Sequence, residues 1–303
     1  MTHAQSCEIR ITEVGPRDGL QNEATILSVD QKVAFIDLLS ASGVAEIELS
    51  SFVSPTWVPQ LADAKQVFSQ ISRRDSVVYS ALVPNEAGMR RAMEANADKI
   101  AIFTAASESF SQKNTNATIA ETLDRFKPVI TQAKNAGLPI RGYISCVVAC
   151  PYEGPIDPQR VRDVAAQLLD LGVDEIDLGE TIGVAVPSDI DRLYEGLAGL
   201  LDPPQTTLHL HDTRGTALAC ALRALQLGVV SFDASCGGIG GCPYAPNAAG
   251  NLATEDLVYM CNQMGYVTGV DLAALFAASR HIAAVLGRAL PGRVFRADGS
   301  PPS

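Results

Sequence analysis

The 303-residue sequence has no long hydrophobic segment and few basic residues, and each deficit excludes a class of protein. Its longest apolar stretches, such as 217–222 and 272–278, are far shorter than the ~18 residues that a membrane-spanning helix needs. Only 23 Lys and Arg residues stand against 34 Asp and Glu, which gives a formal net charge of −11 at pH 7. Such a chain has no general attraction for nucleic acid or anionic lipid. We therefore expect a soluble protein without a nucleic-acid or membrane partner.

Cysteine is also scarce, and its spacing is not that of a disulfide framework. The seven cysteines are odd in number and form no C-x-x-C pair, in a chain too large to need disulfides for stability. The N-terminal segment MTHAQSCEIR lacks the basic and apolar regions of a secretory signal and any Arg-rich amphipathic stretch. These absences predict a reducing compartment, and we expect the cytoplasm.

No composition shift, long linker or block of charge marks a domain boundary. Short β-branched runs instead alternate with longer segments of helical period, which is typical of βα units with a parallel sheet. The eight predicted strands are 9–14, 46–51, 77–83, 99–104, 140–147, 175–179, 207–211 and 231–234. We expect one domain over residues 1–296 and a disordered tail over 297–303.

Start and stop signals mark helices between these strands. Ser28 and Gln31 are typical of a capping box, and Gly43 of a helix stop. The other predicted helices are 117–135, 158–171, 187–200 and 216–227, with two more after the last strand. An open doubly wound sheet usually carries a G-x-G-x-x-G turn after its first strand, and the GPRDG turn here lacks it. The fold class is therefore α/β, a single (β/α)₈ TIM barrel with additional C-terminal helices.

Reactive side chains gather where the predicted strands end, on the side of a barrel that carries the active site. His209 and His211 are two residues apart on one strand, so their imidazoles face the same side. Together with a carboxylate such as Asp18, after the first strand, they offer ligands for a divalent cation and leave positions open for substrate oxygens. The alternative is that one histidine is a buried core residue. Asp212, the next residue, we expect to cap the following helix rather than to orient a histidine.

Other polar residues near the strand ends each have two interpretations. Asn251 is a turn or cap residue, or its amide oxygen binds the metal. Glu48 and Glu180 are structural partners of Arg17, or acid and base groups. Cys242 lies in a glycine-rich loop that could close as a lid over the barrel mouth. Its thiol either moves a proton there or is a small buried hydrophobe.

Segments spread over nearly the whole chain resemble the 3-hydroxy-3-methylglutaryl-CoA lyases, or hydroxymethylglutaryl-CoA lyases. The matching segments are VGPRDGLQNE at 14–23, ELSSFVSP at 48–55, RGYISC at 141–146, CPYEG at 150–154, HLHDT at 209–213, GGCPYA at 240–245 and GNLATEDLVYM at 250–260. The first and sixth are specific to that family, whereas R-D-G and H-x-H-D mark a wider group of metal-dependent lyases and Claisen-type synthases. The resemblance implies a barrel with an extra C-terminal helical region. It also implies Mg²⁺- or Mn²⁺-dependent cleavage of 3-hydroxy-3-methylglutaryl-CoA to acetyl-CoA and acetoacetate, as in leucine degradation.

The resemblance further implies roles for particular residues. The metal ligands are Asp18, His209, His211 and Asn251. Arg17 contacts the thioester carbonyl, where it meets the negative charge of the forming enolate. Gln21, Asn114 and Tyr143 line the acyl-CoA pocket with Arg17, although an exposed polar loop explains Asn114 equally well. The hydroxyl proton goes to Glu48, Glu180 or His209, and Cys242 on the lid protonates the enolate carbon.

Three positions depart from the family pattern. Asn247 replaces a frequent glycine, although Asn tolerates left-handed geometry better than most other residues. Glu180 stands where the family commonly has Asp, and Leu210 separates the histidines where a cysteine is common, on the face that points away from them. The substrate therefore has an alternative, a 3-hydroxyglutaryl-CoA with a larger C3 substituent. A second alternative is a barrel that binds acyl-CoA without cleaving it. The family also suggests a homodimer.

Overall fold

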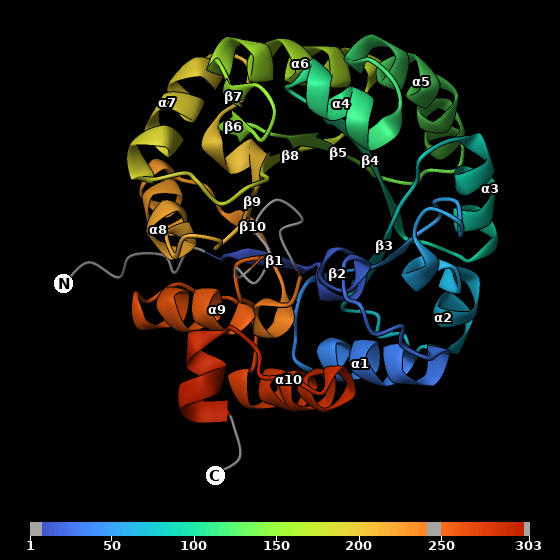
Figure 1. The fold of residues 1–303 in the computed structure, drawn as a ribbon, viewed down its shortest axis with the longest axis vertical. Helices are drawn as coiled ribbons and strands as arrows, with labels where there is room; N and C mark the ends of the chain where they lie inside the picture. The colour runs from blue at the N-terminus through green and yellow to red at the C-terminus, as the bar shows by residue number, and fades with distance from the viewer. Residues whose placement is uncertain (1–7, 241–249, 300–303) are drawn as a thin grey trace.

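The structure is a computed structural model that describes residues 8–240 and 250–299. Within these residues, parallel strands close into a barrel in the order β1-β10-β9-β8-β5-β4-β3-β2, around the centre of Figure 1. The barrel strands are β1 (Arg10–Glu13), β2 (Glu46–Ser51), β3 (Val78–Leu82), β4 (Lys99–Ala105), β5 (Ile140–Ser145), β8 (Glu175–Glu180), β9 (Thr206–Leu210) and β10 (Ser231–Ala234). An antiparallel pair, β6 (Ala149–Cys150) and β7 (Gly154–Pro155), follows β5. The predicted (β/α)₈ barrel is confirmed.

Helices form a ring outside the strands (Figure 1). They are α1 (Val29–Ala41), α2 (Ala64–Gln70), α3 (Glu86–Glu94), α4 (Glu108–Thr115), α5 (Ile119–Asn135), α6 (Pro158–Leu171), α7 (Pro187–Leu197), α8 (Ala217–Leu227), α9 (Thr254–Gln263) and α10 (Leu272–Leu286). The sequence did not predict α2, α3 or α4. These helices have at most nine residues, and the residue before α2, Asp63, makes no capping bond because its carboxylate binds Lys32. Short helices of this kind depend on tertiary packing for their stability.

The predicted start and stop signals act as expected. Ser28 Oγ accepts a bond from the Gln31 amide (3.3 Å), while Gln31 Oε1 accepts one from the Ser28 amide (2.9 Å), which completes the capping box of α1. Gly172 and Gly228 end α6 and α8 with left-handed φ values of 92° and 101°. A side chain at these φ values would be strained, so glycine fixes where each helix stops and the next strand begins.

The hydrophobic core lies between the strands and the helix ring, whereas the barrel interior is charged. Ile100, Ile144 and Phe232 point outward into the core and are fully buried. The alternate residues of the same strands point inward and form a set of buried ion pairs, which we call the interior network: Glu46, Lys99, Arg141, Glu175, Asp177 and Asp233. Barrel interiors are usually filled by branched aliphatic side chains. Here their place is taken by paired charges.

The helices after the last barrel strand, α9 and α10, complete the ring next to the first helix of the chain. α10 packs against α1, far away in sequence (Figure 1). Residues 297–299, where we expected a disordered tail to begin, belong to the helical turn η5 (Phe295–Gly299). Among the helices of the described chain, none has the length and apolarity that a bilayer crossing requires.

Candidate active site

The first site residues lie on η1 (Gly15–Gly19), a tight helical turn that follows β1 directly. The amides of Arg17, Asp18 and Gly19 all donate to the Val14 carbonyl, at 3.1, 2.8 and 3.1 Å. Glu13 Oε1 accepts the Gly15 amide at 2.8 Å, and an added Cβ at Gly15 would lie only 2.6 Å from that oxygen. The turn therefore needs glycine, and it directs Arg17 and Asp18 to the C-terminal mouth of the barrel.

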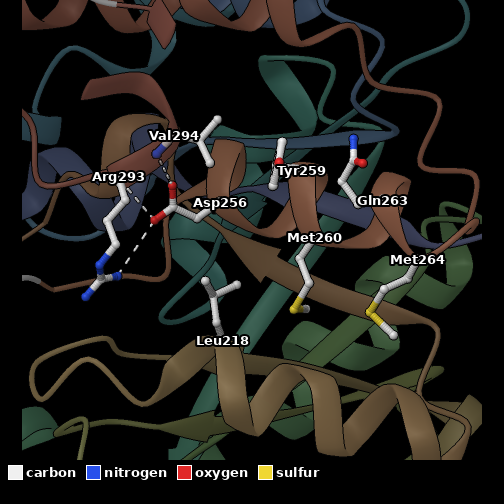
Figure 2. A pocket seen from close by; sticks show the side chains of 8 residues that line it. All are labelled: Leu218, Asp256, Tyr259, Met260, Gln263, Met264, Arg293 and Val294. Atoms are coloured by element: carbon white, nitrogen blue, oxygen red, sulfur yellow. Dashed lines mark hydrogen bonds and ion pairs between the residues drawn. The ribbon is translucent and has the colours of Figure 1, made fainter. Parts of the chain in front are cut away.

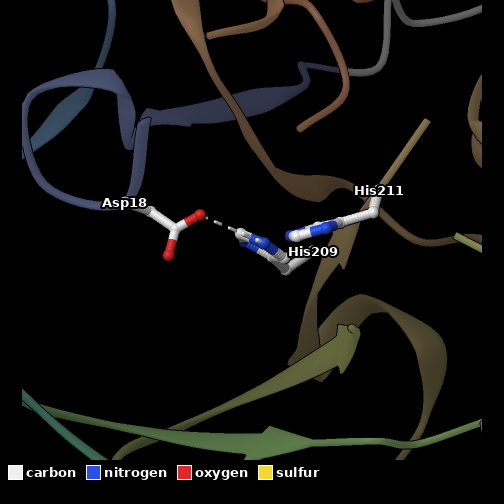
Figure 3. Close-up of side chains that lie close together, drawn as sticks. All are labelled: Asp18, His209 and His211. Atoms are coloured by element: carbon white, nitrogen blue, oxygen red, sulfur yellow. Dashed lines mark ion pairs between the residues drawn. The ribbon is translucent and has the colours of Figure 1, made fainter. Parts of the chain in front are cut away.

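Both histidines reach the same mouth from the end of β9. Their ring centroids are 5.2 Å apart, and His209 Nε2 lies 4.0 Å from Asp18 Oδ2. Potential ligand atoms of Asp18, His209 and His211 all lie within 4.8 Å of one another, an arrangement shown in Figure 3. We call these three residues the Asp–His–His cluster. Leu210 pairs with Glu180 on the opposite face of the strands, so it points away from the cluster, as expected.

Asn251 completes the surroundings of the cluster. It forms a β-bridge with His211, and its Nδ2 donates to Asp18 Oδ2 (2.9 Å) and to the Ile239 carbonyl (3.2 Å). Its Oδ1 and the Nδ1 atom of His211 are buried and have no hydrogen-bond partner within the described chain. Buried polar atoms are rarely left unsatisfied. An unpartnered amide oxygen and an unpartnered imidazole nitrogen beside a carboxylate therefore fit a bound divalent cation.

The electrostatics keep Asp18 and His211 in the protonation state that binds metal. Burial acts to lower the pKa of His209, but the hydrogen bond to Asp233 and the charge of Asp18 outweigh it and raise that pKa. Burial acts to raise the pKa of Asp18, but Arg17 first, and then the two histidines, outweigh it and hold that pKa below its ordinary value. Burial and the neighbouring His209 lower the pKa of His211 to about 4. An ionised Asp18 and a neutral His211 are thus present at neutral pH, as metal ligation requires.

Arg17 joins the cluster to two further predicted residues. Its Nη1 donates to Asp18 Oδ1 (2.6 Å) and its Nε to Glu48 Oε2 (2.5 Å), while its guanidinium lies 5.5 Å from the centroid of the Tyr143 ring. Two carboxylates on different nitrogen atoms fix the plane of the guanidinium. Burial raises the pKa of Glu48, and Asp233 adds to this, although Arg17 opposes it.

Glu180 makes no hydrogen bond or ion pair with Arg17, Glu48 or the Asp–His–His cluster within the described residues. Glu180 is the outward-facing residue at the end of β8, and its Oε1 accepts the Val184 amide at 3.1 Å. It holds the loop after β8 in place. Burial raises the pKa of Glu180, and the charge of His209 acts against that rise. The outward orientation of Glu180 follows from strand parity, because Asp177 and Gly179 occupy the inward positions of β8. Asp212 caps α8 as expected, since its Oδ1 accepts the Ala217 amide at 3.0 Å.

The remaining predicted site residues differ in their position and in their exposure. Gln21 is half-buried and lies three residues beyond Asp18, just after η1. Asn114 lies on α4 and is exposed. Cys242, the proposed lid thiol, and Asn247 lie outside the described residues. The described start of its glycine-rich loop runs along the cluster, because a Cβ at Gly240 would lie 2.6 Å from Asn251 Nδ2.

Comparison with known proteins agrees with this geometry. The family model described as HMGL-like matches residues 8–282. The chain is 47% identical over 290 residues to the cytoplasmic 3-hydroxy-3-methylglutaryl-CoA lyase of Rattus norvegicus, a match that covers 96% of this chain and 84% of the rat protein. The chain belongs to the hydroxymethylglutaryl-CoA lyase family. It is therefore a carbon–carbon lyase.

Two further members of the hydroxymethylglutaryl-CoA lyase family are similar over their full length. The Pseudomonas aeruginosa protein named 3-hydroxy-3-isohexenylglutaryl-CoA/hydroxymethylglutaryl-CoA lyase is 46% identical, over 96% of this chain and 97% of its own. A solved structure of an HMG-CoA lyase from Acinetobacter baumannii, in complex with coenzyme A and 3-methylmalate, aligns with a TM-score of 0.92 at 39% identity, over 100% of both chains.

Sequence reasoning missed two buried residues that support the site of this lyase. Asp233 on β10 binds His209, and Arg141 on β5 binds Asp233. The sequence did contain a signal for both residues, because each is a charged residue within a strand that was predicted to be buried. In the segment Ser-Phe-Asp-Ala at 231–234, the polar residues alternate with apolar ones, which is the pattern of a strand with one polar face.

A separate pocket of about 440 Å³ lies on the outside of the barrel (Figure 2). It is lined mainly by apolar side chains of α8 and α9, with Arg293 bound to Asp256 at one end: Leu218, Asp256, Tyr259, Met260, Gln263, Met264, Arg293 and Val294. No member of the Asp–His–His cluster lines it. This pocket therefore lies apart from the barrel mouth, the end at which TIM-barrel enzymes carry their active sites.

Proposed function

We propose that this chain cleaves 3-hydroxy-3-methylglutaryl-CoA to acetyl-CoA and acetoacetate. The observation that carries the proposal is the convergence of Asp18, His209 and His211 at the barrel mouth with Arg17 bonded to Asp18. The names of the two relatives and of the structural neighbour support the same substrate. The rat relative is a cytoplasmic protein by name, which supports a cytoplasmic location for this chain.

The residues that would hold the cation are Asp18, His209, His211 and Asn251, the last through Oδ1. Nitrogen and oxygen donors of this kind suit Mg²⁺ or Mn²⁺. When bound, such a cation supplies Lewis acidity that makes the tertiary hydroxyl of the substrate more acidic. His209 is a ligand in this assignment rather than a base, because its Nδ1 contacts Asp233 and its Nε2 faces Asp18.

Glu48 is the proton acceptor in our proposal. Its Oε2 is held by Arg17, whereas its buried Oε1 has no hydrogen-bond partner within residues 8–240 and 250–299. The raised pKa of Glu48 makes its carboxylate a stronger base than an exposed one. With Glu180 directed elsewhere, Glu48 is the predicted carboxylate base that remains at the mouth.

Arg17 stabilises the other half of the reaction. When the hydroxyl proton leaves, the bond between C2 and C3 breaks, C3 becomes the ketone of acetoacetate, and the electron pair moves into the enolate of acetyl-CoA. A guanidinium held in one plane by Asp18 and Glu48 meets the charge on the thioester oxygen without reorganising. The enolate carbon then takes a proton, which we assign to Cys242. Gln21, Asn114 and Tyr143 remain candidates for contacts with the substrate.

Substitution of Arg17 tests the function. The Arg17→Gln variant should lose turnover by about 10²–10³-fold or more, because a donor to developing charge is removed. It should bind Mn²⁺ at least as well as the unmodified protein, because a cation next to Asp18 is removed as well. Arg10→Gln, which removes the half-exposed partner of Glu175, is the matched control and should retain turnover. Turnover of Arg17→Gln within about tenfold of the control would contradict the enolate role.

The Pseudomonas aeruginosa relative, named for two substrates, favours a second candidate, a thioester with a larger C3 substituent. The ratio of kcat/KM for 3-hydroxy-3-methylglutaryl-CoA and 3-hydroxy-3-isohexenylglutaryl-CoA separates the two candidates. We expect the methyl compound to be preferred, as leucine degradation requires. Preference for the isohexenyl compound would reverse the assignment. If the protein cleaves neither compound, the remaining alternative is a barrel that binds acyl-CoA without cleaving it. We also propose a homodimer, which light scattering tests.

A further inference from the structure

Asp233 on β10 lies beside His209 on β9, inside the barrel and below its mouth. The parallel register pairs these two residues directly, and His209 Nδ1 is 3.1 Å from Asp233 Oδ2. Asp233 is 1% exposed, so water does not compete for this contact. An ionised carboxylate accepts hydrogen bonds and donates none, so Nδ1 of His209 carries the hydrogen. The lone pair of His209 is then on Nε2, the atom that faces Asp18.

Asp233 is itself held in place from the other side of the barrel. Its Oδ1 accepts Arg141 Nη1 at 2.9 Å, and its Oδ2 accepts the Tyr143 hydroxyl at 3.3 Å. Arg141 is in turn fixed by Thr12 Oγ1 and by Glu175, both at 2.9 Å. Both oxygens of Asp233 are thus anchored to β5, a rigid strand. The partner of a metal-ligating histidine needs this rigidity in order to hold the ring in one orientation.

His211 has no comparable support. Its Nδ1 is buried without a partner in the described residues, and its backbone, through the bridge with Asn251, is what places it. The two histidines of the cluster therefore differ. Nδ1 of His209 is hydrogen-bonded to a carboxylate in the metal-free protein, which selects one tautomer of that ring. No neighbouring side chain among the described residues selects a tautomer of His211.

We propose that Asp233 is a positioning residue that fixes the tautomer and ring orientation of His209, so that Nε2 is free to bind the divalent cation. The proposal rests on the proposed function, because it concerns the same metal site. It adds a residue that does not touch the substrate. The anchoring by Arg141 and Tyr143 makes the interior network part of the metal site.

The Asp233→Asn variant tests the proposal because it removes the negative charge of the side chain while it keeps the size and shape of that side chain. Arg141 donates, so the amide oxygen turns toward Arg141 and the amide NH₂ faces His209. His209 must then accept at Nδ1 and carry its hydrogen on Nε2, where it blocks the metal. We expect the Mn²⁺ dissociation constant, measured by titration without substrate, to rise about 10- to 100-fold.

Histidine ¹⁵N spectra of the metal-free protein give a direct readout. At about pH 9, above the ordinary histidine pKa, the unmodified protein should show His209 as the Nδ1–H tautomer and Asp233→Asn should show the Nε2–H tautomer. Glu46→Gln is the matched control, since Glu46 is another buried carboxylate of the interior network that lies 3.4 Å from Arg141, and its ion pairs involve neither Asp233 nor His209. It should keep both the tautomer and the Mn²⁺ affinity.

Three results would overturn the proposal. One is an Nε2–H tautomer of His209 in the unmodified protein, which can be seen whether or not Asp233→Asn folds. The others are an unchanged Mn²⁺ affinity in Asp233→Asn, and an equal loss in Glu46→Gln. Cleavage of the thioester by a protein with the Nε2–H tautomer overturns this inference and leaves the proposed function standing. The Nδ1–H tautomer together with the affinity loss supports the inference whichever thioester is cleaved.

Discussion

The barrel interior and the barrel mouth both contain buried carboxylates, but they differ in how those carboxylates are balanced. In the interior network, each carboxylate lies within 3.5 Å of a nitrogen of Lys99 or Arg141. At the mouth, Arg17 pairs with Asp18 and Glu48, yet Asn251 Oδ1 and His211 Nδ1 find no donor in the described part of the chain. Glu46 Oε1, Arg141 Nε and both oxygens of Asp177 also lack a hydrogen bond in the described residues, so the two regions differ in their charges and not in whether unpartnered atoms occur. In the interior these atoms belong to ion-paired side chains, whereas at the mouth Asn251 Oδ1 and His211 Nδ1 are neutral atoms beside the Asp18 carboxylate.

The proton balance of the interior supports this difference. The network has two cations for four carboxylates, Glu46, Glu175, Asp177 and Asp233. Burial, and then the neighbouring Asp233, raise the pKa of Asp177 well above its ordinary value, so Asp177 keeps its proton. A proton on Asp177 thus offsets one of the two excess negative charges, and Arg10 on Glu175 offsets the other, whereas the mouth leaves lone pairs for an external cation. Substitutions in the interior should therefore affect folding, with Asp233 affecting metal binding as well because it holds His209, and substitutions at the mouth should mainly affect binding.

The largest effect is expected when the interior loses its central cation. Arg141→Met leaves Asp177, Asp233 and Glu175 without their shared partner, and breaking a buried ion pair on one side costs about 3–5 kcal/mol. The free energy of unfolding, from denaturant titration, should fall by this amount. Arg10→Met removes the half-exposed partner of Glu175 and should cost less than about 1 kcal/mol. Equal losses in the two variants would show that burial of the network contributes nothing.

Glu13 sharpens the comparison because it is a buried carboxyl bound to neutral donors, the amides of Gly15 and Cys236 and the hydroxyl of Thr254. Burial raises its pKa to about 8, although these three bonds oppose the shift. A raised folded-state pKa contributes stability that is complete below the ordinary value of 4.5 and is lost as the pH rises through about 8.

The Glu13→Gln variant, which resembles the protonated form, should flatten that pH dependence. The free energy of unfolding of the unmodified protein should fall by a few kcal/mol at most between about pH 5 and pH 8, since each unit of pKa shift corresponds to about 1.4 kcal/mol. The difference between the unmodified protein and Glu13→Gln, measured across that range, checks the sign. A Glu13→Gln variant whose stability falls with pH as steeply as that of the unmodified protein would assign the effect to other groups.

The smallest effect on folding is expected at the mouth. His211→Ala removes a ligand that has no partner on its Nδ1, so the metal-free protein should lose less unfolding free energy than Arg141→Met does. The Mn²⁺ dissociation constant should nevertheless rise at least tenfold, or about 1.4 kcal/mol. His281→Ala on α10, where His281 Nε2 contacts the Gln31 carbonyl, is the control that should leave Mn²⁺ binding unchanged. An unchanged dissociation constant in His211→Ala would exclude direct ligation.

Strand positions were predictable from the sequence because each barrel strand is a short β-branched run with turn signals on both sides. The predicted 46–51 and 231–234 coincide with β2 and β10, and the other strands agree within two residues. The short helices α2 to α4 were missed because their stability comes from packing. The spacing of His209 and His211 placed both on one face, and the structure agrees.

The interpretation of Glu180 shows where sequence reasoning stops. A strand end predicts that a residue lies near the mouth, but a shift of one position changes the face of the sheet. Glu180 therefore points to the loop after β8, while Asp177 points inward. The same uncertainty hid Asp233, since a charge in a predicted core strand reveals its partner only when the neighbouring strands are in register.

By itself, the sequence determined the barrel, the position of the Asp18 turn and the pair of histidines, because hydrophobic period, turn residues and side-chain alternation are local properties. The tertiary structure decided which charges meet. Arg141 reaches Asp233 across the barrel, and Asp18 reaches His209 and Asn251 from the other end of the chain. Those contacts depend on strand order and register, which closure of the barrel sets for all strands together.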